Sequence, residues 1–300
     1  MTVRELFDLF LAWCADNDRA PATRAFYRTR LRLFLAKYGD REFGSLAPLD
    51  VQAWLAAAGR QPDGTQYAPD TRRSNVVAFQ RFQQWAVENG ALAAPIVARL
   101  EKPRGRDRER IPTDAETARL LKNASPEFTA IYQALRQCGA RPGELCLATI
   151  AHIRWEQHGE RKAAGDARPA AIVLMHHKTA RKVGRPRVIV CGQKLGEMLL
   201  AAIGAGTPAG RRTEGPIFLA PQGRAWSVRH LSRVYRRLRD QAGLDAALVL
   251  YSARHEHGTA ICKAKGIQAA ADALGHANLS TTQRYVHIDD ESQRDNQDLF

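Results

Sequence analysis

The sequence predicts a mainly α-helical protein of two domains, the second of which carries a small antiparallel β-sheet. Two observations lead to this fold class. Apolar residues recur at helical spacing throughout the first third of the chain, whereas three strand-like runs occur only later. Between them, residues 102–112 (KPRGRDRERIP) have no apolar period and are bracketed by prolines, which is typical of a linker. We therefore expect a helical domain at 1–101, a basic linker at 102–112 and a second domain at 113–300.

The first domain is expected to be a helical bundle. Thr2 and Glu5 have the capping-box spacing that opens a helix, and apolar residues follow at i, i+4 and i+7. Further helices are expected over 23–38, 48–58 and 69–89, because each of these stretches repeats apolar residues on one face.

Arginines recur on the polar sides of these helices. Arg24, Arg28 and Arg32 are spaced four residues apart, and Arg73 and Arg81 lie off the apolar face of a later helix. A stripe of this kind is most often a solvated face. The whole chain, however, has 45 basic against 31 acidic residues and a net charge of +14, which favours a polyanionic partner. We therefore expect these five arginines to contact double-stranded DNA, with a solvated face as the alternative.

The second domain mixes helices with the small sheet. A capping box at Thr113 opens it, a helix over 126–138 ends at Gly139, and Pro142 opens the next helix. Strands are expected over 149–157, 171–177 and 186–191. Helices are expected over 227–242, from Ser252 to an interruption at Gly266, over 267–274, and from a capping box at Ser280.

Two arginines stand where helices are expected to begin. Arg141 lies between the end of one helix and the start of the next, and Arg254 lies in the first turn of its helix. Backbone N–H groups at a helix start favour an anion, and an arginine beside them forms a phosphate clamp. For Arg141 taken alone, a salt bridge with Glu144 at the helix end is the alternative.

Five short motifs follow one another in the second domain. They are Gly139-Ala-Arg-Pro-Gly-Glu-Leu145, Lys178-Thr179, Tyr251-Ser-Ala-Arg-His255, Leu274-Gly-His276 and Thr281-Thr-Gln-Arg-Tyr285. In this order and spacing they resemble the tyrosine recombinase (phage integrase) family. The resemblance covers about 112–288 specifically and the N-terminal bundle less so. It implies a SAM-like core-binding domain followed by a tyrosine-recombinase catalytic domain.

The resemblance implies a role for each motif residue at a scissile phosphate. Arg141 and Arg254 would hold the non-bridging oxygens and oppose the charge that grows in the transition state. His276 would donate a hydrogen bond to the phosphate, and Glu144 would orient an arginine.

The resemblance also assigns the bond-making steps. Tyr285 would attack the phosphate and form a 3′-phosphotyrosine, and Lys178 would protonate the leaving 5′ oxygen. Lys182 and Arg185 lie in the same expected hairpin, and the match to the family's Lys-Thr pair favours Lys178. This chemistry implies neither a metal ion nor another cofactor.

Tyr251 departs from the family pattern, which has histidine or sometimes lysine at this position. A phenol donates or accepts a hydrogen bond but is a poor base near neutral pH. We expect Tyr251 still to contact the phosphate, with proton transfer either weakened or passed to a neighbour such as His255 or His257.

Together these features predict a site-specific DNA recombinase or integrase that acts as a homotetramer on paired DNA sites. The alternatives are a topoisomerase of the same chemistry, resembling type IB, and a non-catalytic DNA-binding accessory protein. No apolar run is long enough to cross a bilayer and the N-terminus has no signal-peptide pattern, so we expect a cytoplasmic protein, nucleoid-associated when bound to DNA.

Overall fold

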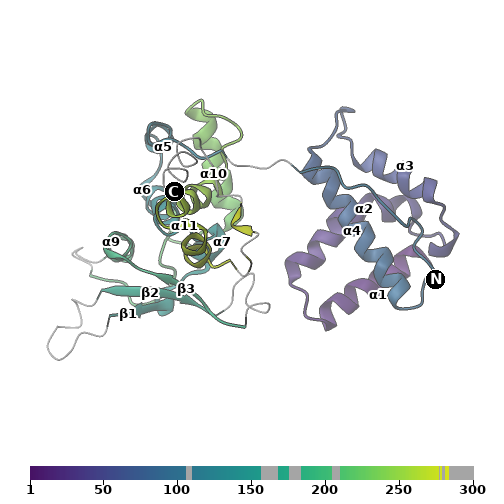
Figure 1. The fold of residues 1–300 in the computed structure, drawn as a ribbon, viewed down its shortest axis with the longest axis horizontal. Helices are drawn as coiled ribbons and strands as arrows, with labels where there is room; N and C mark the ends of the chain where they lie inside the picture. Colours follow the sequence, from purple (N-terminus) through teal and green to yellow (C-terminus); the bar gives the residue numbers. More distant parts are fainter. Residues whose placement is uncertain are drawn as a thin grey trace, which may run out of the picture. The chain divides into compact units, whose positions relative to one another are not determined.

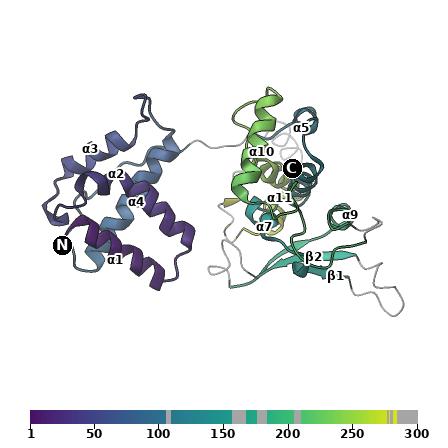
Figure 2. The same cartoon turned by 180° about the vertical axis from the view of Figure 1, so that it is seen from behind.

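The computed structural model describes residues 1–105, 110–156, 168–175, 184–204, 210–276, 278 and 281–283. It divides into two compact units, Met1–Asp107 and Arg108–Phe300, shown from two sides in Figures 1 and 2. A mostly helical chain with one small antiparallel sheet confirms the predicted fold class. The division between residues 107 and 108 falls inside the segment expected to be the linker. The exact bounds of the two domains, at 101 and 113, remain predictions.

The first unit is a four-helix bundle with a largely aromatic core. Its elements are α1 (Val3–Asp16), α2 (Pro21–Tyr38), the 3₁₀ turn Phe43–Ser45, α3 (Pro48–Ala58) and α4 (Pro69–Glu88). Proline opens α2, α3 and α4, where its missing N–H costs no helical hydrogen bond. Phe10, Phe34 and Phe79 are fully buried where α1, α2 and α4 pack together. The buried apolar residues of this unit form one hydrophobic cluster, and those of the second unit form another.

The second unit contains six labelled helices, one 3₁₀ turn and three strands among the residues that the structure describes. They are α5 (Asp114–Leu121), α6 (Pro126–Cys138), α7 (Pro142–Leu147), the 3₁₀ turn Ile150–His152, β1 (Ile153–Trp155), β2 (Pro169–Leu174), β3 (Arg187–Val190), α9 (Gln193–Ala202), α10 (Val228–Gln241) and α11 (Ser252–Leu274), the last of which is interrupted at Gly266. In Figure 1, α9 lies over one face of the sheet, which it contacts through β2.

The sheet is antiparallel in the order β1-β2-β3, with Ile153 opposite Ile172 and Ile172 opposite Ile189. The first strand is shorter than the predicted 149–157. The start of the predicted segment forms a 3₁₀ turn instead, because the backbone N–H of Thr149 donates a hydrogen bond to Nδ1 of His152 at 3.0 Å. The other two strands begin within two residues of the predicted positions.

Helix α11 joins the two ends of the site described below. Gly266 (φ 82°, ψ 171°) breaks it where the sequence predicts an interruption, and Gly275 (φ 64°) ends it in the left-handed conformation. Its first half packs along α6, whose own C-terminal glycine, Gly139 (φ 59°), is also left-handed. These turns bring the start of α7, the start of α11 and the end of α11 close together. None of the described helices is both long and apolar enough to span a bilayer.

Candidate active site

Arg141 and Glu144 form one paired unit at the start of α7. The Nη1 atom of Arg141 lies 2.8 Å from Oε1 of Glu144, and the backbone N–H of Arg141 donates to Oε2 at 2.9 Å. The side chain of Glu144 is 5% exposed and that of Arg141 is 18% exposed. The carboxylate is thus fixed inside the protein, while part of the guanidinium reaches the surface. Because α7 is only six residues long, the preference for an anion rests on the side chain rather than on a helix dipole.

Arg254 is almost fully buried, at 1% exposure, in the first turn of α11. Its Nη1 atom donates to the carbonyl oxygen of Gly139 at 2.6 Å, and its Nη2 atom donates to that of Leu274 at 2.8 Å. Gly139 precedes Arg141 by two positions, and Leu274 precedes His276 by two. Arg254 therefore ties the chain leading to Arg141 to the chain leading to His276.

His276 is held by the segment that precedes Tyr285. Its Nδ1 atom lies 2.7 Å from the hydroxyl of Thr282, which is completely buried, and its backbone N–H donates to the carbonyl of Ala271 at 2.9 Å. A bond at Nδ1 fixes the ring and leaves Nε2 on the opposite side of the imidazole. The Leu-Gly-His motif and the Thr-Thr motif are therefore in direct contact.

Tyr251 lies at the N-terminal boundary of α11 and packs against His255. The two rings are edge to face, with centroids 5.2 Å apart. His257 lies elsewhere: its Nδ1 atom is 3.2 Å from the carbonyl oxygen of Arg136, and its ring packs against Gly139. Burial lowers the pKa of His257 below its usual range. Of the two neighbours considered for proton transfer, only His255 touches Tyr251.

Arg187, the first residue of β3, belongs to this cluster although the sequence analysis did not select it. It is 7% exposed, and its Nε atom lies 3.9 Å from Oε2 of Glu144. Its Nη2 atom donates to the carbonyl of Ala273 at 2.6 Å. Burial lowers the pKa of this guanidinium, Glu144 opposes that effect, and Arg254 and Arg141 add to it. The guanidiniums of Arg141 and Arg187 therefore share the carboxylate of Glu144, and with the charge of Arg254 acting on Arg187 the excess positive charge favours an anion.

A pocket of about 730 Å³ opens beside this cluster. Arg141, Glu144 and Tyr251 line one side of it, and Arg236 and Arg239 of α10 line another. Arg236 is exposed, and nothing in its local pattern separates it from the other arginines of α10. The remaining lining is mostly apolar and includes residues of α7, β2, α10 and the loop before Tyr251. The pocket brings Arg141 and Tyr251 to one cavity, whereas Arg254 and His276 are not in its wall.

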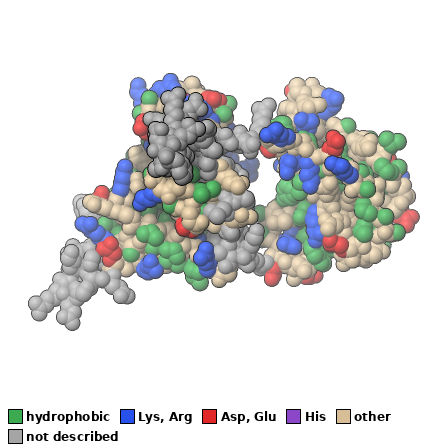
Figure 3. Space-filling model, viewed as in Figure 1, with side chains coloured by type: hydrophobic (Ala, Val, Ile, Leu, Met, Phe, Trp, Pro, Cys, Tyr) green, Lys and Arg blue, Asp and Glu red, His purple; other side chains and the backbone are tan. Residues whose placement is uncertain are grey.

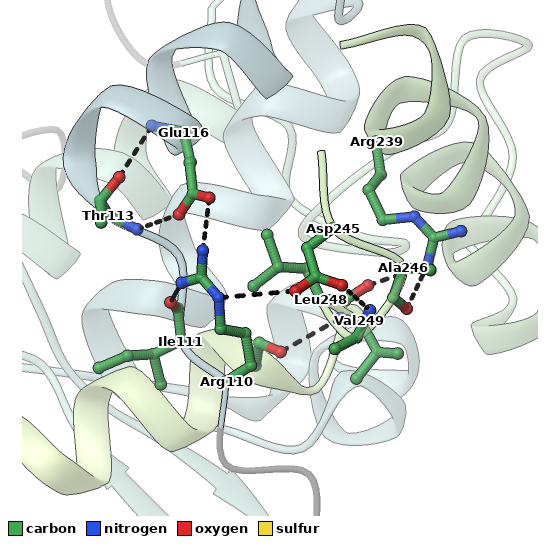
Figure 4. Close-up of polar contacts among 11 residues, drawn as sticks. Arg110, Ile111, Thr113, Glu116, Arg239, Asp245, Ala246, Leu248 and Val249 are labelled. Carbon is green, nitrogen blue, oxygen red and sulfur yellow. Dashed lines mark hydrogen bonds and ion pairs between the residues drawn. The ribbon is translucent and has the colours of Figure 1, made fainter. Parts of the chain in front are cut away.

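The loop that precedes Tyr251 is fixed by two arginines, shown in Figure 4. The Nη1 atom of Arg239 donates to the carbonyls of Ala246 and Leu248 at 2.9 and 3.0 Å. Arg110 lies 3.9 Å from Asp245 and is also bonded to Glu116 of the α5 capping box at 2.6 Å. The position of Tyr251 thus depends on contacts with α10 and with Arg110, which lies in the segment expected to be the linker.

Two residues with predicted chemical roles, Lys178 and Tyr285, lie outside the described residues, as does Lys182. The helix predicted from Ser280 also falls mostly outside them; Thr281 to Gln283 are described. Arg185, the other cation considered in the hairpin, is described and exposed. Among the described residues, no group of three His, Cys, Asp or Glu side chains is arranged to hold a metal ion.

The arginines predicted to grip DNA are found on α2 and α4. Arg28 and Arg32 are exposed and, with Arg4 of α1, line a shallow pocket of about 300 Å³. Arg81 is bonded to Glu88 at 3.2 Å and its guanidinium lies 5.3 Å from the ring of Trp13. The two other predicted contacts are the half-buried Arg24 and the exposed Arg73. Figure 3 shows basic side chains on the visible face of this unit with acidic ones among them.

Comparison with known proteins agrees with the motif order. The model of the phage integrase family matches residues 112–292. The tyrosine recombinase XerC of Rhodospirillum centenum is 29% identical over 297 residues, covering 92% of this chain and 81% of the relative. The tyrosine recombinase XerC of Corynebacterium efficiens is 27% identical over 282 residues, covering 90% and 82%.

Solved structures share the fold. A lambda integrase dimer bound to a COC′ core site superposes with a TM-score of 0.73 at 16% identity, covering 95% of each chain. The integrase of transposon Tn1549 in complex with transposon right-end DNA gives a TM-score of 0.69 at 16% identity, covering 100% of this chain and 99% of the other. Because the family model matches more than half of the sequence, the protein belongs to the phage integrase family, the tyrosine-type site-specific DNA recombinases.

Proposed function

We propose that this recombinase breaks and rejoins double-stranded DNA through a covalent bond between Tyr285 and a 3′ phosphate. The phenol oxygen forms a bond to phosphorus as the bond from phosphorus to the 5′ oxygen breaks. The phenol loses its proton, and Lys178 supplies one to the departing 5′ oxygen. Attack by the 5′ hydroxyl of another strand reverses these steps, so the energy of the bond is kept without ATP or a metal ion.

The observation that carries this proposal is the carboxylate of Glu144 shared by Arg141 and Arg187, next to the pocket that Arg141 and Tyr251 line. A pentacoordinate phosphate carries more negative charge than the ground state, so positive groups fixed in advance stabilise the transition state. In this proposal Arg141 holds one non-bridging oxygen from the pocket wall. Arg254 would contact the phosphate from the first turn of α11, and His276 would donate from Nε2.

Tyr251 takes the place of the usual histidine in this proposal. Its hydroxyl donates a hydrogen bond to the phosphate, and the ring contact with His255 makes that histidine the group that accepts or returns a proton. Tyr251→Phe is expected to slow strand cleavage about tenfold, because one donated hydrogen bond is lost while the packing is kept. Cleavage and rejoining at wild-type rates in this variant would remove Tyr251 from the mechanism.

DNA contacts are proposed on both units. Arg24, Arg28, Arg32, Arg73 and Arg81 would contact the phosphate backbone from the first unit, as predicted from the sequence. Arg236 would do so beside the active site, because it is exposed and lines the pocket that Arg141 reaches. We further propose that the chain works in the cytoplasm on chromosomal or mobile DNA.

Exchange between two duplexes needs four cleavages, so we propose a homotetramer on paired sites. Support comes from a structural relative with a TM-score of 0.69, a lambda integrase tetramer bound to a Holliday junction, although at 16% identity that likeness concerns the fold alone. A particle containing four copies of the chain on two duplexes, measured by light scattering, is the expected result.

The experiment that tests the function uses duplexes with a random central sequence and a nick beside it. Cleavage near the nick releases a short fragment that diffuses away, so the covalent complex accumulates and survives denaturing detergent. We expect such complexes with the wild-type chain, unchanged by EDTA and absent in Tyr285→Phe. Tyr67→Phe, in the first unit, is the matched control and is expected to retain them.

The recovered duplexes also separate recombination from its alternatives. Exchange of strands between two different recovered duplexes is expected from a recombinase. Relaxation of supercoiled DNA without exchange would indicate a topoisomerase, and tight binding without any covalent complex would indicate an accessory protein.

A further inference from the structure

Arg187 connects three parts of the active site without having a predicted role in the chemistry. Arginine is rarely buried unless it is paired, yet this one is 7% exposed. It begins β3, the strand that follows the segment containing Lys178. Its guanidinium reaches Glu144 on one side and the last turn of α11 on the other.

On the first side, Arg187 shares Glu144 with Arg141. One oxygen of the carboxylate lies 2.8 Å from Nη1 of Arg141. The other accepts the backbone N–H of Arg141 at 2.9 Å and lies 3.9 Å from Nε of Arg187. The longer distance is an ion pair rather than a hydrogen bond. Arg187 therefore restrains the carboxylate that orients Arg141.

On the second side, Arg187 and Arg254 hold consecutive carbonyl groups. Arg187 donates to Ala273 at 2.6 Å and Arg254 donates to Leu274 at 2.8 Å. These carbonyls belong to the end of α11, where positive charge is favourable. Two guanidiniums thus fix the turn from which His276 projects.

Gly275 lies directly on the guanidinium of Arg187. A Cβ atom at this position would lie 2.7 Å from Nη1 and 2.9 Å from Cζ of Arg187. Its φ of +64° is also unfavourable for other residues. The glycine of the Leu-Gly-His motif is therefore required for two reasons, and one of them is contact with Arg187.

We propose that Arg187 is a positioning residue that holds Arg141 and His276 at a fixed separation before DNA binds. It acts on Arg141 through Glu144 and on His276 through the C-terminal turn of α11, and it joins both to the strand after Lys178. The proposal rests on the proposed function, because it assumes that Arg141 and His276 contact the phosphate. Active-site groups must be placed within a fraction of an ångström, and neighbouring contacts provide that accuracy.

The first test compares Arg187→Gln with Arg212→Gln. Arg212 also donates to three carbonyls, those of Ala202, Pro216 and Ile217, and none of these three bonds involves the site. Single-turnover formation of the covalent complex and DNA affinity are measured on a duplex recovered with the wild-type chain. We expect Arg187→Gln to slow the covalent step at least tenfold while Kd changes less than twofold, and Arg187→Lys to restore part of the rate.

Arg212→Gln is expected to lower the melting temperature and to leave the covalent rate within twofold of wild type. The positioning role is refuted if Arg187→Gln cleaves at the wild-type rate. It is also refuted if Arg212→Gln slows cleavage as much as Arg187→Gln does, because the effect would then be a general loss of structure.

The second test uses glycine substitutions. Gly243 has a φ of +61°, and a Cβ atom there would have nothing within 4 Å among the described atoms, so Gly243→Ala measures the backbone cost alone. We expect Gly275→Ala to slow cleavage at least fivefold more than Gly243→Ala does. In the Arg187→Gln background this excess should fall to less than twofold, because the shorter side chain removes the clash. An unchanged excess would contradict a connection through Arg187.

The outcomes also separate this inference from the proposed function. If the wild-type chain forms no covalent complex, or if Tyr285→Phe still forms it, the proposed function fails and the role of Arg187 fails with it. If the wild-type complex depends on Tyr285 and Arg187→Gln matches the wild-type rate, only the role of Arg187 fails.

Discussion

At the scale of single residues, the hydroxyl of Thr282 is a contact that orients the imidazole of His276. The hydroxyl is buried and lies 2.7 Å from Nδ1 of the imidazole. Thr282→Val keeps the shape and removes the bond, so it is expected to cost about 1 kcal/mol and to lower the melting temperature by roughly 2–4 °C. The rate of strand cleavage should fall by more than the loss of stability explains, because the imidazole of His276 can then rotate. Thr282→Ser keeps the hydroxyl and serves as the control; if it behaves like Thr282→Val, the bond to His276 is not the cause.

His257 predicts a pH dependence of stability. Burial lowers its pKa in the folded chain, so the unfolded chain binds a proton first as the pH falls. The contribution of His257 to stability is therefore complete above about pH 6.5, its usual value, and decreases as the pH falls toward the folded value. In melting experiments between pH 8 and pH 5, His257→Asn should lose part of this decrease. An identical pH dependence in wild type and His257→Asn would show that the imidazole is not protonated on unfolding.

Local pairs at this scale could be predicted from the sequence, whereas distant ones could not. Arg141 and Glu144 are three residues apart, so the sequence itself predicts their salt bridge as an alternative role for Arg141. The bond from Arg187 to Ala273 joins residues 86 positions apart, and no sequence periodicity reports such a contact. Burial of arginine is also rare, so a lone arginine at the start of a strand gives no sign of its role.

At the scale of elements, the glycines that end helices set the approach of α6 to α11. Gly139 has a φ of +59°, and a Cβ atom there would lie 2.8 Å from Cγ of His257 and 3.0 Å from Leu274. Gly139→Ala should therefore destabilise the second unit by at least 1 kcal/mol more than Gly243→Ala, whose φ is similar but whose surroundings are open. Thermal unfolding measures the difference. Equal losses in the two variants would mean that the helices separate without cost.

Most helix boundaries were predictable because proline, glycine and capping residues mark them, as at α3 and α6, whose observed bounds match the prediction. Helix α9 was not predicted. Its sequence contains Gly196, which weakens the helical signal, although a Cβ atom there would make only an ordinary contact, at 3.7 Å, with the carbonyl of Pro169 on β2. Strand β1 was predicted too long because a side-chain bond from His152, which periodicity does not report, turns the chain before the strand begins.

At the scale of the whole molecule, the order of five motifs predicted the recombinase family, which no single motif could indicate alone. The start of α7, the start of β3 and the end of α11 meet at the cluster around Glu144, although Arg141, Arg187 and Ala273 are widely separated in sequence. Charge at this scale predicted a polyanionic partner through the excess of 45 basic over 31 acidic residues. It did not predict which arginines lie beside the pocket, because that depends on how α10 packs against α7.

Mapping the covalent bond decides whether Tyr285 is the residue that carries the DNA. Trypsin cleaves after Arg284 and Arg294, so Tyr285 lies in the peptide YVHIDDESQR. Nuclease and trypsin digestion of the denatured covalent complex, followed by mass spectrometry, should give this peptide with a nucleotide joined through its 3′ phosphate to Tyr285. A nucleotide found on another residue, such as Tyr251, or the absence of any modified peptide from a complex that resists detergent, would contradict the account.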